Sequence, residues 1–167
     1  MDFDNICIVG TGAIGCVIGS FLSDAGYKVN FIEKDENIIK QIKENGISIS
    51  GAKEIHCDNI SISSPGGIKE KQDLIFYAVK AYSLEDAVKS SIQMVGKDTY
   101  VVCIQNGLGI SEIVNKYINK RQTIEGIIWF PAITVKPGNI QLLTFYEQSI
   151  FGGFSYISQE YISKLTL

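Results

Sequence analysis

The chain has 167 residues, a length that suits one domain and allows a sizeable hydrophobic core. Its formal net charge is −3, with 15 basic and 18 acidic residues and no basic stripe, which argues against a general nucleic-acid-binding protein. Because the sequence shows neither a signal peptide nor an apolar run of about 18 residues, we expect a cytoplasmic protein without a membrane partner. The four cysteines form no CxxC pair and only one histidine is present, so no metal site is predicted.

The N-terminal residues carry the strongest motif in the chain. A short apolar run, residues 6–9, leads directly into Gly10-Thr11-Gly12-Ala13-Ile14-Gly15, and an apolar helical face follows. Strand, glycine turn and helix in this order are the context in which a GxGxxG pattern binds a dinucleotide. Gly10 allows a sharp turn, Gly12 allows the backbone to approach a pyrophosphate, and Gly15 allows the helix to pack closely on the strand. The N–H groups that start the helix would then face the phosphates, whereas the alternative is a tight turn that binds nothing.

The next segments alternate between helical and strand patterns. The first helix ends near Asp24-Ala25-Gly26, with Gly26 just past its end, and Asp35 caps a second helix that stops at Asn45-Gly46. Further helices begin near Leu84 and Ile110. Strands are predicted over residues 28–33, 47–50, 73–79, 99–104 and 123–132, with a strand or hairpin within 54–62.

The pattern changes towards the C-terminus. Lys136-Pro137-Gly138-Asn139 is typical of a turn, residues 140–146 and 149–152 have the pattern of antiparallel strands, and Ser158 could cap a last helix. Alternating strands and helices predict an α/β fold, a Rossmann-type doubly wound parallel sheet, with a C-terminal antiparallel hairpin at one edge. We therefore interpret residues 1–167 as one NAD(P)-binding domain and expect a second domain after Leu167.

Two charged residues follow the second predicted strand. In this fold an acidic residue about 20 positions past the glycines hydrogen-bonds the adenosine ribose, and Glu33 fits that role, which favours NAD(H). Lys34 could instead pair with the 2′-phosphate of NADP(H). Because neighbouring side chains of a strand point to opposite faces, only one of the two would face the ribose if the strand reached both. Both could equally be solvated residues before a helix, so the spacing leaves the choice of cofactor open.

Two polar side chains stand at further strand ends, where ligands of open α/β sheets bind. Lys80 follows the strand over 73–79 and can reach a phosphate or carboxylate, although a surface lysine before a helix is the alternative. Asn106 lies in Gln105-Asn106-Gly107-Leu108-Gly109 after the next strand, and could hold a carbonyl or a nicotinamide amide. An Asn-Gly turn selected for its positive φ is the alternative for this segment.

In this order the motifs resemble the ketopantoate reductase (2-dehydropantoate 2-reductase) family. The segments that carry the resemblance are the Gly10–Gly15 motif, Val79-Lys80-Ala81, residues 105–109, and Pro137-Gly138-Asn139-Ile140 before Phe151-Gly152. The resemblance covers essentially the whole chain. It implies a Rossmann-type N-terminal domain followed by an all-helical domain, and the reduction of 2-ketopantoate to pantoate with NADPH on the way to pantothenate and coenzyme A.

The same resemblance implies roles for single residues. Residues Gly10 to Gly15 would hold the pyrophosphate, and Lys34 falls where the family often has a basic residue for the 2′-phosphate. Lys80 and Asn106 match cofactor-contacting residues, Asn106 is also near the substrate, and Ala132 matches a residue that lines the nicotinamide side. The family's proton-donating lysine and most substrate-binding residues belong to the helical domain, so no catalytic residue is predicted in this chain. We therefore expect it to bind NADPH, or NADH because of Glu33, with little or no turnover alone.

Other functions remain open on the sequence. A regulatory NAD(H)-sensing Rossmann module, like those that gate potassium transporters, would bind the nucleotide and catalyse nothing. The N-terminal domain of another two-domain 2-hydroxyacid or sugar-nucleotide dehydrogenase would look similar, whereas a methyltransferase fits the three-glycine spacing less well. We expect a small 2-oxo acid as substrate, no nucleic-acid partner, and leave a homodimer open.

Overall fold

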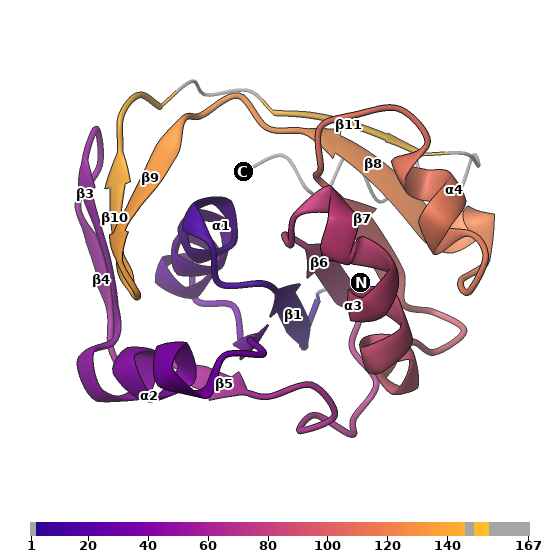
Figure 1. Cartoon of the computed structure of the whole chain (residues 1–167), viewed down its shortest axis with the longest axis horizontal. Coiled ribbons are helices and arrows are strands. Elements are labelled where there is room, and N and C mark those ends of the chain that lie inside the picture. The colour runs from indigo at the N-terminus through magenta and orange to yellow at the C-terminus, as the bar shows by residue number, and fades with distance from the viewer. Residues whose placement is uncertain (1–2, 146–148, 154–167) are drawn as a thin grey trace.

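A seven-stranded sheet forms the centre of the computed structural model, which describes residues 3–145 and 149–153. The strand order is β11-β8-β7-β6-β1-β2-β5, and β11 alone runs antiparallel to its neighbour (Figure 1). The strands are β1 (Ile6–Val9), β2 (Val29–Ile32), β5 (Ser61–Ser63), β6 (Leu74–Tyr77), β7 (Tyr100–Cys103), β8 (Thr123–Ile127) and β11 (Ile150–Gly153). The mostly parallel sheet confirms the predicted fold class.

The central strands are short and buried on both faces. Every residue of β1, β2, β6 and β7 is buried, as expected for parallel strands covered by helices on each side. One face packs on α1 (Ala13–Asp24) and α2 (Glu36–Asn45), and the other on α3 (Leu84–Ser91) and α4 (Ile110–Val114). Three single-turn 3₁₀ helices complete the described helices: η1 (Ala81–Ser83), η2 (Ile92–Met94) and η3 (Lys120–Gln122).

The ends of the helices follow local capping rules. Asp35 is the N-cap of α2, and its carboxylate accepts from the N–H groups of Asn37 (2.9 Å) and Ile38 (3.3 Å). Gly46 ends that helix with a φ of 70°. These boundaries confirm the predictions, whereas α4 is shorter than its sequence pattern suggests and ends at Val114. Among the described residues, no helix has the length and apolar character needed to cross a membrane.

A second, four-stranded sheet covers the outer side of α1. Its order is β4 (Ile55–Cys57), β3 (Ile47–Gly51), β10 (Asn139–Leu142) and β9 (Ala132–Lys136). Figure 1 shows α1 lying between this sheet and β1, and α1 contacts strands of both sheets. The helix is consequently apolar almost all round, with residues 15–20 all buried.

The second sheet corrects the prediction for the C-terminal strands. An antiparallel strand does lie at one edge of the main sheet, but β10 and β11, which carry the described parts of the strands predicted over 140–146 and 149–152, pair with different strands. Instead β10 pairs with β9 and β3, because Ile140 and Leu142 bury their side chains in the core around α1. The predicted strand 123–132 is likewise divided between β8 and β9, with Pro131, which lacks an N–H group, in the gap. Ser158 lies outside the described residues.

We expect Gly19→Ala to destabilise the fold, because a Cβ on this α1 residue would overlap the ring of Phe31 and come within 3.2 Å of Ile8 Cγ1. Overpacking of this kind costs about 1–3 kcal/mol of unfolding free energy, which urea denaturation would measure. Gly96→Ala is the matched control, since the nearest heavy atom to its Cβ outside the adjoining residues would be Lys71 Cγ at 3.5 Å. Equal stability of the two variants would contradict the close packing of α1 on β2.

Candidate cofactor-binding site

The carboxyl ends of four neighbouring strands bring most of the predicted site residues to one edge of the sheet. The strands lie in the order β7-β6-β1-β2, and their ends lead into Asn106, Lys80, Gly10 and Glu33 respectively. The chain winds from β1 to β2 in one direction and from β6 to β7 in the other, so β1 and β6 flank the topological switch point. Ligands of doubly wound sheets bind in the crevice at this point.

The three motif glycines are required for different reasons. Gly10 has a φ of 105°, and a Cβ there would lie 2.9 Å from Val79 Cγ1. A Cβ on Gly15 would overlap the carbonyl oxygen of Gly10, so a side chain would push α1 away from β1. A Cβ on Gly12, in contrast, would have no heavy atom of the described chain within 4 Å, and its φ of −70° suits any residue. Packing within the chain therefore does not explain Gly12, whereas space for a pyrophosphate does.

The start of α1 offers free hydrogen-bond donors beside that space. Gly12 is the N-cap and supplies no side-chain hydrogen bond, and no acidic residue lies in the first turn. The first N–H groups of a helix have no partner within the helix, and the macrodipole places partial positive charge on them. The first turn of α1 thus fits a phosphate group.

Glu33 holds the glycine turn in place. Its Oε2 accepts from Thr11 Oγ1 at 2.6 Å and from Thr11 N at 3.2 Å. Its Oε1 accepts from the N–H groups of Lys34 at 2.8 Å and Asp35 at 3.1 Å. A carboxylate has about four acceptor positions, so groups of the chain itself occupy all of them. β2 ends at Ile32, so strand alternation does not decide which of Glu33 and Lys34 faces a ligand.

Both predicted lysines are exposed at this edge. Lys34 follows Glu33 directly, and Lys80 stands between β6 and η1, where its carbonyl accepts from Ser83 N at 2.9 Å. Within residues 3–145 and 149–153, neither ammonium group makes an ion pair. Two unpaired positive charges therefore lie on the rim of the crevice.

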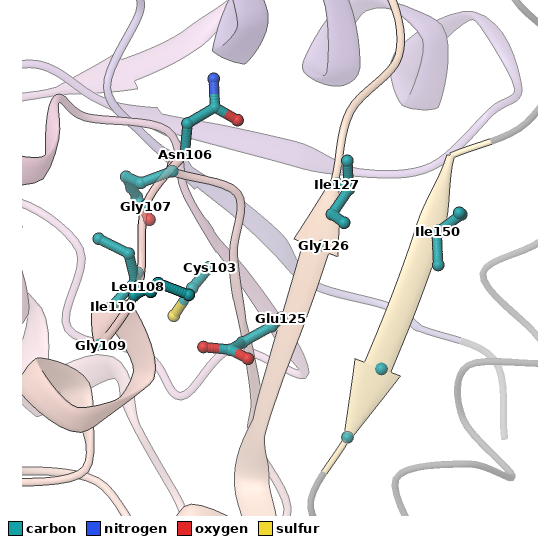
Figure 2. A pocket seen from close by; sticks show the side chains of 13 residues that line it. Cys103, Asn106, Gly107, Leu108, Gly109, Ile110, Glu125, Gly126, Ile127 and Ile150 are labelled. Carbon is teal, nitrogen blue, oxygen red and sulfur yellow. The ribbon is translucent and has the colours of Figure 1, made fainter.

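The segment after β7 contributes an amide on each of two successive residues. Asn106 is exposed, and Figure 2 shows its side chain extending away from the loop that leads to α4. Gln105 turns inward, and its Nε2 donates to the carbonyls of Tyr77 (2.7 Å) and Val79 (3.0 Å). Gln105 belongs to the motif over residues 105–109, but no role for it is predicted from the sequence. Its position two residues after β7 marks it as a polar residue near a strand end, but the direction in which its amide points has no signal in the sequence.

A cavity of about 560 Å³ adjoins Asn106 on the side of β8 and β11 (Figure 2). Glu125 lies in its wall and was not predicted; its Oε1 accepts from Ser111 N at 3.2 Å, at the start of α4. Cys103 also lines the cavity, and burial, with a smaller contribution from Glu125, raises the pKa of its thiol to about 12. The thiol is therefore neutral near pH 7 and is not a nucleophile there.

Ala132 stands apart from this row of strand ends. It is the first residue of β9 in the second sheet, where it is half-buried and lies opposite Leu142. The structure thus gathers the predicted glycines, both lysines, Glu33 and Asn106 at one edge of the main sheet, and places Ala132 in a different sheet.

A glycine turn between β1 and α1, with no side-chain cap on the helix and at the switch point of a doubly wound sheet, defines a Rossmann-type dinucleotide-binding domain. Comparison with known families narrows this class. The family model described as "Ketopantoate reductase PanE/ApbA" matches residues 6–155, and the chain belongs to this family.

Relatives of known name agree with the family. The chain is 34% identical over 161 residues to a 2-dehydropantoate 2-reductase of Pyrococcus abyssi, an alignment that covers 96% of this chain and 51% of the relative. It is 31% identical over 137 residues to the enzyme of the same name from Streptococcus pyogenes serotype M1, covering 82% of this chain and 44% of the relative. The chain therefore spans about half the length of the relatives that it matches.

Solved structures show the same fold. An Enterococcus faecalis protein described as a 2-dehydropantoate 2-reductase is 30% identical, with a TM-score of 0.87 over 96% of this chain and 52% of its own. A D-mandelate dehydrogenase, solved with NADH and anilino(oxo)acetate, is 27% identical with a TM-score of 0.87, covering 96% of this chain and 52% of its own.

We expect Gly12→Ala to weaken dinucleotide binding without unfolding the chain, because the added Cβ fills only the open space above the turn. Calorimetric titration with NADPH and with NADH should show that the variant binds at least about tenfold, or ~1.4 kcal/mol, more weakly than the parent chain. Urea denaturation should give stability within about 1 kcal/mol of the parent. Unchanged dinucleotide affinity would contradict the assignment of this space to a pyrophosphate.

Proposed function

We propose that this chain is the NADPH-binding part of a 2-dehydropantoate 2-reductase, which reduces 2-ketopantoate to pantoate on the way to pantothenate and coenzyme A. The observation that carries the proposal is the row formed by Glu33, Gly10, Lys80 and Asn106 at four adjacent strand ends, beside the open space at Gly12. Membership of the ketopantoate reductase family and the names of the relatives support the reaction.

The residues of the row would bind and orient the cofactor rather than carry out the chemistry. The bound nicotinamide supplies a hydride for the ketone carbon of the substrate. The first N–H groups of α1 would hold the pyrophosphate, and Glu33 would keep Thr11 and the turn in the conformation that presents them. Lys80 and Asn106 would fix the part of the cofactor nearer the substrate, and Asn106 would also contact the oxo acid. Ala132, which begins β9 of the second sheet, would line the nicotinamide side of the bound cofactor, as the family resemblance implies.

The hydrogen bonds of Glu33 favour NADPH over NADH. A ribose 2′-hydroxyl that bonded to Glu33 would have to displace one of four donors that the chain already provides. The ammonium group of Lys34 is exposed and unpaired, and could meet a 2′-phosphate without displacing a group of the chain. The NADH in the related D-mandelate dehydrogenase structure keeps NADH as the alternative.

The substrate would be a small 2-oxo acid bound beside Asn106. Support comes from the cavity of about 560 Å³ that adjoins this residue, and from the anilino(oxo)acetate in the D-mandelate dehydrogenase complex. A proton must also reach the alkoxide that forms on the substrate. Near this edge, burial raises the pKa of both Cys103 and Tyr77. Because a group with a raised pKa is a weaker acid, neither side chain is an effective proton donor to the alkoxide. We propose that the donor lies in the half of the relatives that this chain does not span.

A cytoplasmic location fits the same proposal. Cys7, Cys16, Cys57 and Cys103 are all free thiols, as is usual in a reducing compartment.

Residues 1–167 alone should bind NADPH but should not oxidise it when 2-ketopantoate is added, because this chain offers no proposed proton donor. The measurement is absorbance at the reduced-nicotinamide band over time, with binding followed separately by calorimetry. A fusion of the chain to the second half of the Pyrococcus abyssi relative is the positive control and should restore turnover. Ketopantoate-dependent turnover of the unfused chain above about 1 s⁻¹, an ordinary enzymatic rate, would contradict the proposal that the proton donor lies outside this chain.

We expect Lys34→Ala to weaken NADPH binding about tenfold, or ~1.4 kcal/mol, through loss of a charged partner of the 2′-phosphate, and to leave NADH binding unchanged. Lys40→Ala is the matched control, because this α2 lysine is also exposed but lies away from the glycine turn. Its Nζ is 3.9 Å from Glu44 Oε1. An equal loss for both cofactors, or no loss for NADPH, would remove the assignment of Lys34.

A further inference from the structure

The side-chain amide of Gln105 has hydrogen bonds that the proposed roles of the other site residues do not explain. Its Nε2 donates to two carbonyls of the neighbouring strand end, those of Tyr77 and Val79. Its Oε1 is buried, and has no hydrogen-bond partner among the described residues. A buried acceptor without a partner lowers stability, and such groups in native proteins call for an explanation.

The two donated bonds join strand ends beyond the reach of the sheet ladder. The paired register of β6 with β7 ends at Tyr77 and Cys103. Lys80 and Asn106 both follow that last pair, so no ladder hydrogen bond sets the distance between them. Gln105 immediately precedes Asn106, and one of its two acceptors, Val79, immediately precedes Lys80.

The hydrogen bond from Gln105 to the carbonyl of Val79 also connects Gln105 to the glycine turn, because Val79 packs on that turn. The Val79 side chain packs so closely on Gly10 that a Cβ at Gly10 would lie 2.9 Å from Val79 Cγ1. One side-chain amide thus links the end of β7 to the end of β6, and the end of β6 abuts the turn after β1.

We propose that Gln105 is a positioning residue for the dinucleotide site, which holds Asn106 and Lys80 in register with each other and with the glycine turn. The inference rests on the proposed function, because it assigns Lys80 and Asn106 to the cofactor. The unpartnered Oε1 lowers the stability of the fold, and the orientation that leaves it unpartnered is the one that lets Nε2 donate the two bonds that fix the strand ends.

Gln122 provides a matched control within the same fold. Its Nε2 also donates to two backbone carbonyls, those of Gly96 and Thr99, each at 2.7 Å. These bonds lie just before β7 and β8 begin, at the amino ends of the strands and not at the carboxyl edge that holds the proposed site. Loss of either glutamine amide should therefore have comparable structural consequences, while only one should alter the binding site.

The first test compares Gln105→Met with Gln122→Met, since methionine has a similar length and removes both donated bonds. Each variant is titrated with NADPH by calorimetry and unfolded with urea. We expect Gln105→Met to bind NADPH roughly tenfold more weakly than the parent, as misplacement of binding groups requires, and Gln122→Met to bind like the parent. Parental affinity in Gln105→Met, or an equal loss in both variants, would overturn the inference.

A double-mutant cycle separates positioning from a general structural effect. If Gln105 acts through Lys80 and Asn106, then Gln105→Met should cost roughly tenfold in the parent but less than about twofold when both partners are already alanine. An effect of the same size in both backgrounds would show that the residue does not act through them, and would overturn the inference.

Two further results keep the test decisive. If Gln105→Met does not fold, nuclear magnetic resonance of the parent replaces it: the Gln105 side-chain amide should shift on NADPH addition in step with Asn106, and the Gln122 amide should not. An unmoved Gln105 amide would overturn the inference. Failure of the parent itself to bind either NADPH or NADH would overturn the proposed function and this inference together, whereas parental binding with an indifferent Gln105 overturns the inference alone.

Discussion

The contact between Gly15 and the carbonyl of Gly10 is the constraint on which the rest of the site depends. Because neither glycine carries a Cβ, α1 begins directly against the end of β1 and not a side chain's width away. The small sheet then closes over α1, with Ile140 and Leu142 of β10 completing the core on its outer side. Residues 15–20 of this helix are all buried between the two sheets, and this packing sets the direction in which the first N–H groups of α1 point. The second sheet therefore supports a binding surface that it does not form itself.

The fold could be predicted from sequence where the information is local. The GxGxxG spacing, the Asp35 cap and the continuous apolar strands each depend on a few neighbouring residues, and the structure confirms them. The second sheet could not be predicted in this way, because it joins segments that are distant in the chain: Ser50 Oγ donates to the carbonyl of Ile140 across 90 positions. The alternating pattern of residues 139–142 shows that one face is buried, but not which partner buries it.

The site shows the same division. Lys80 and Asn106 could be singled out because charged and amide side chains are conspicuous directly after buried strands. Glu33 was also singled out, but its hydrogen bonds to Thr11 and to two following N–H groups depend on the conformation of the turn, which the sequence does not show. Gln105 is a still clearer case, since a glutamine after a strand gives no sign of whether its amide faces solvent or two carbonyls.

The electrostatics explain how an acidic domain can present a site for a polyanion. With a net charge of −3, the chain as a whole does not attract phosphate. Near the crevice, however, Glu33 and Glu125 turn towards backbone N–H groups: Glu33 accepts from the glycine turn and the start of α2, and Glu125 accepts at the start of α4. The exposed lysines Lys34 and Lys80 have no carboxylate within ion-pair distance in the described chain, and the first turn of α1 has no acidic residue. Negative charge is thus partly neutralised by local donors, while positive charge remains free at the rim. Because the Debye length at physiological salt is about 8 Å, this local arrangement, and not the net charge, governs a phosphate that lies against the turn.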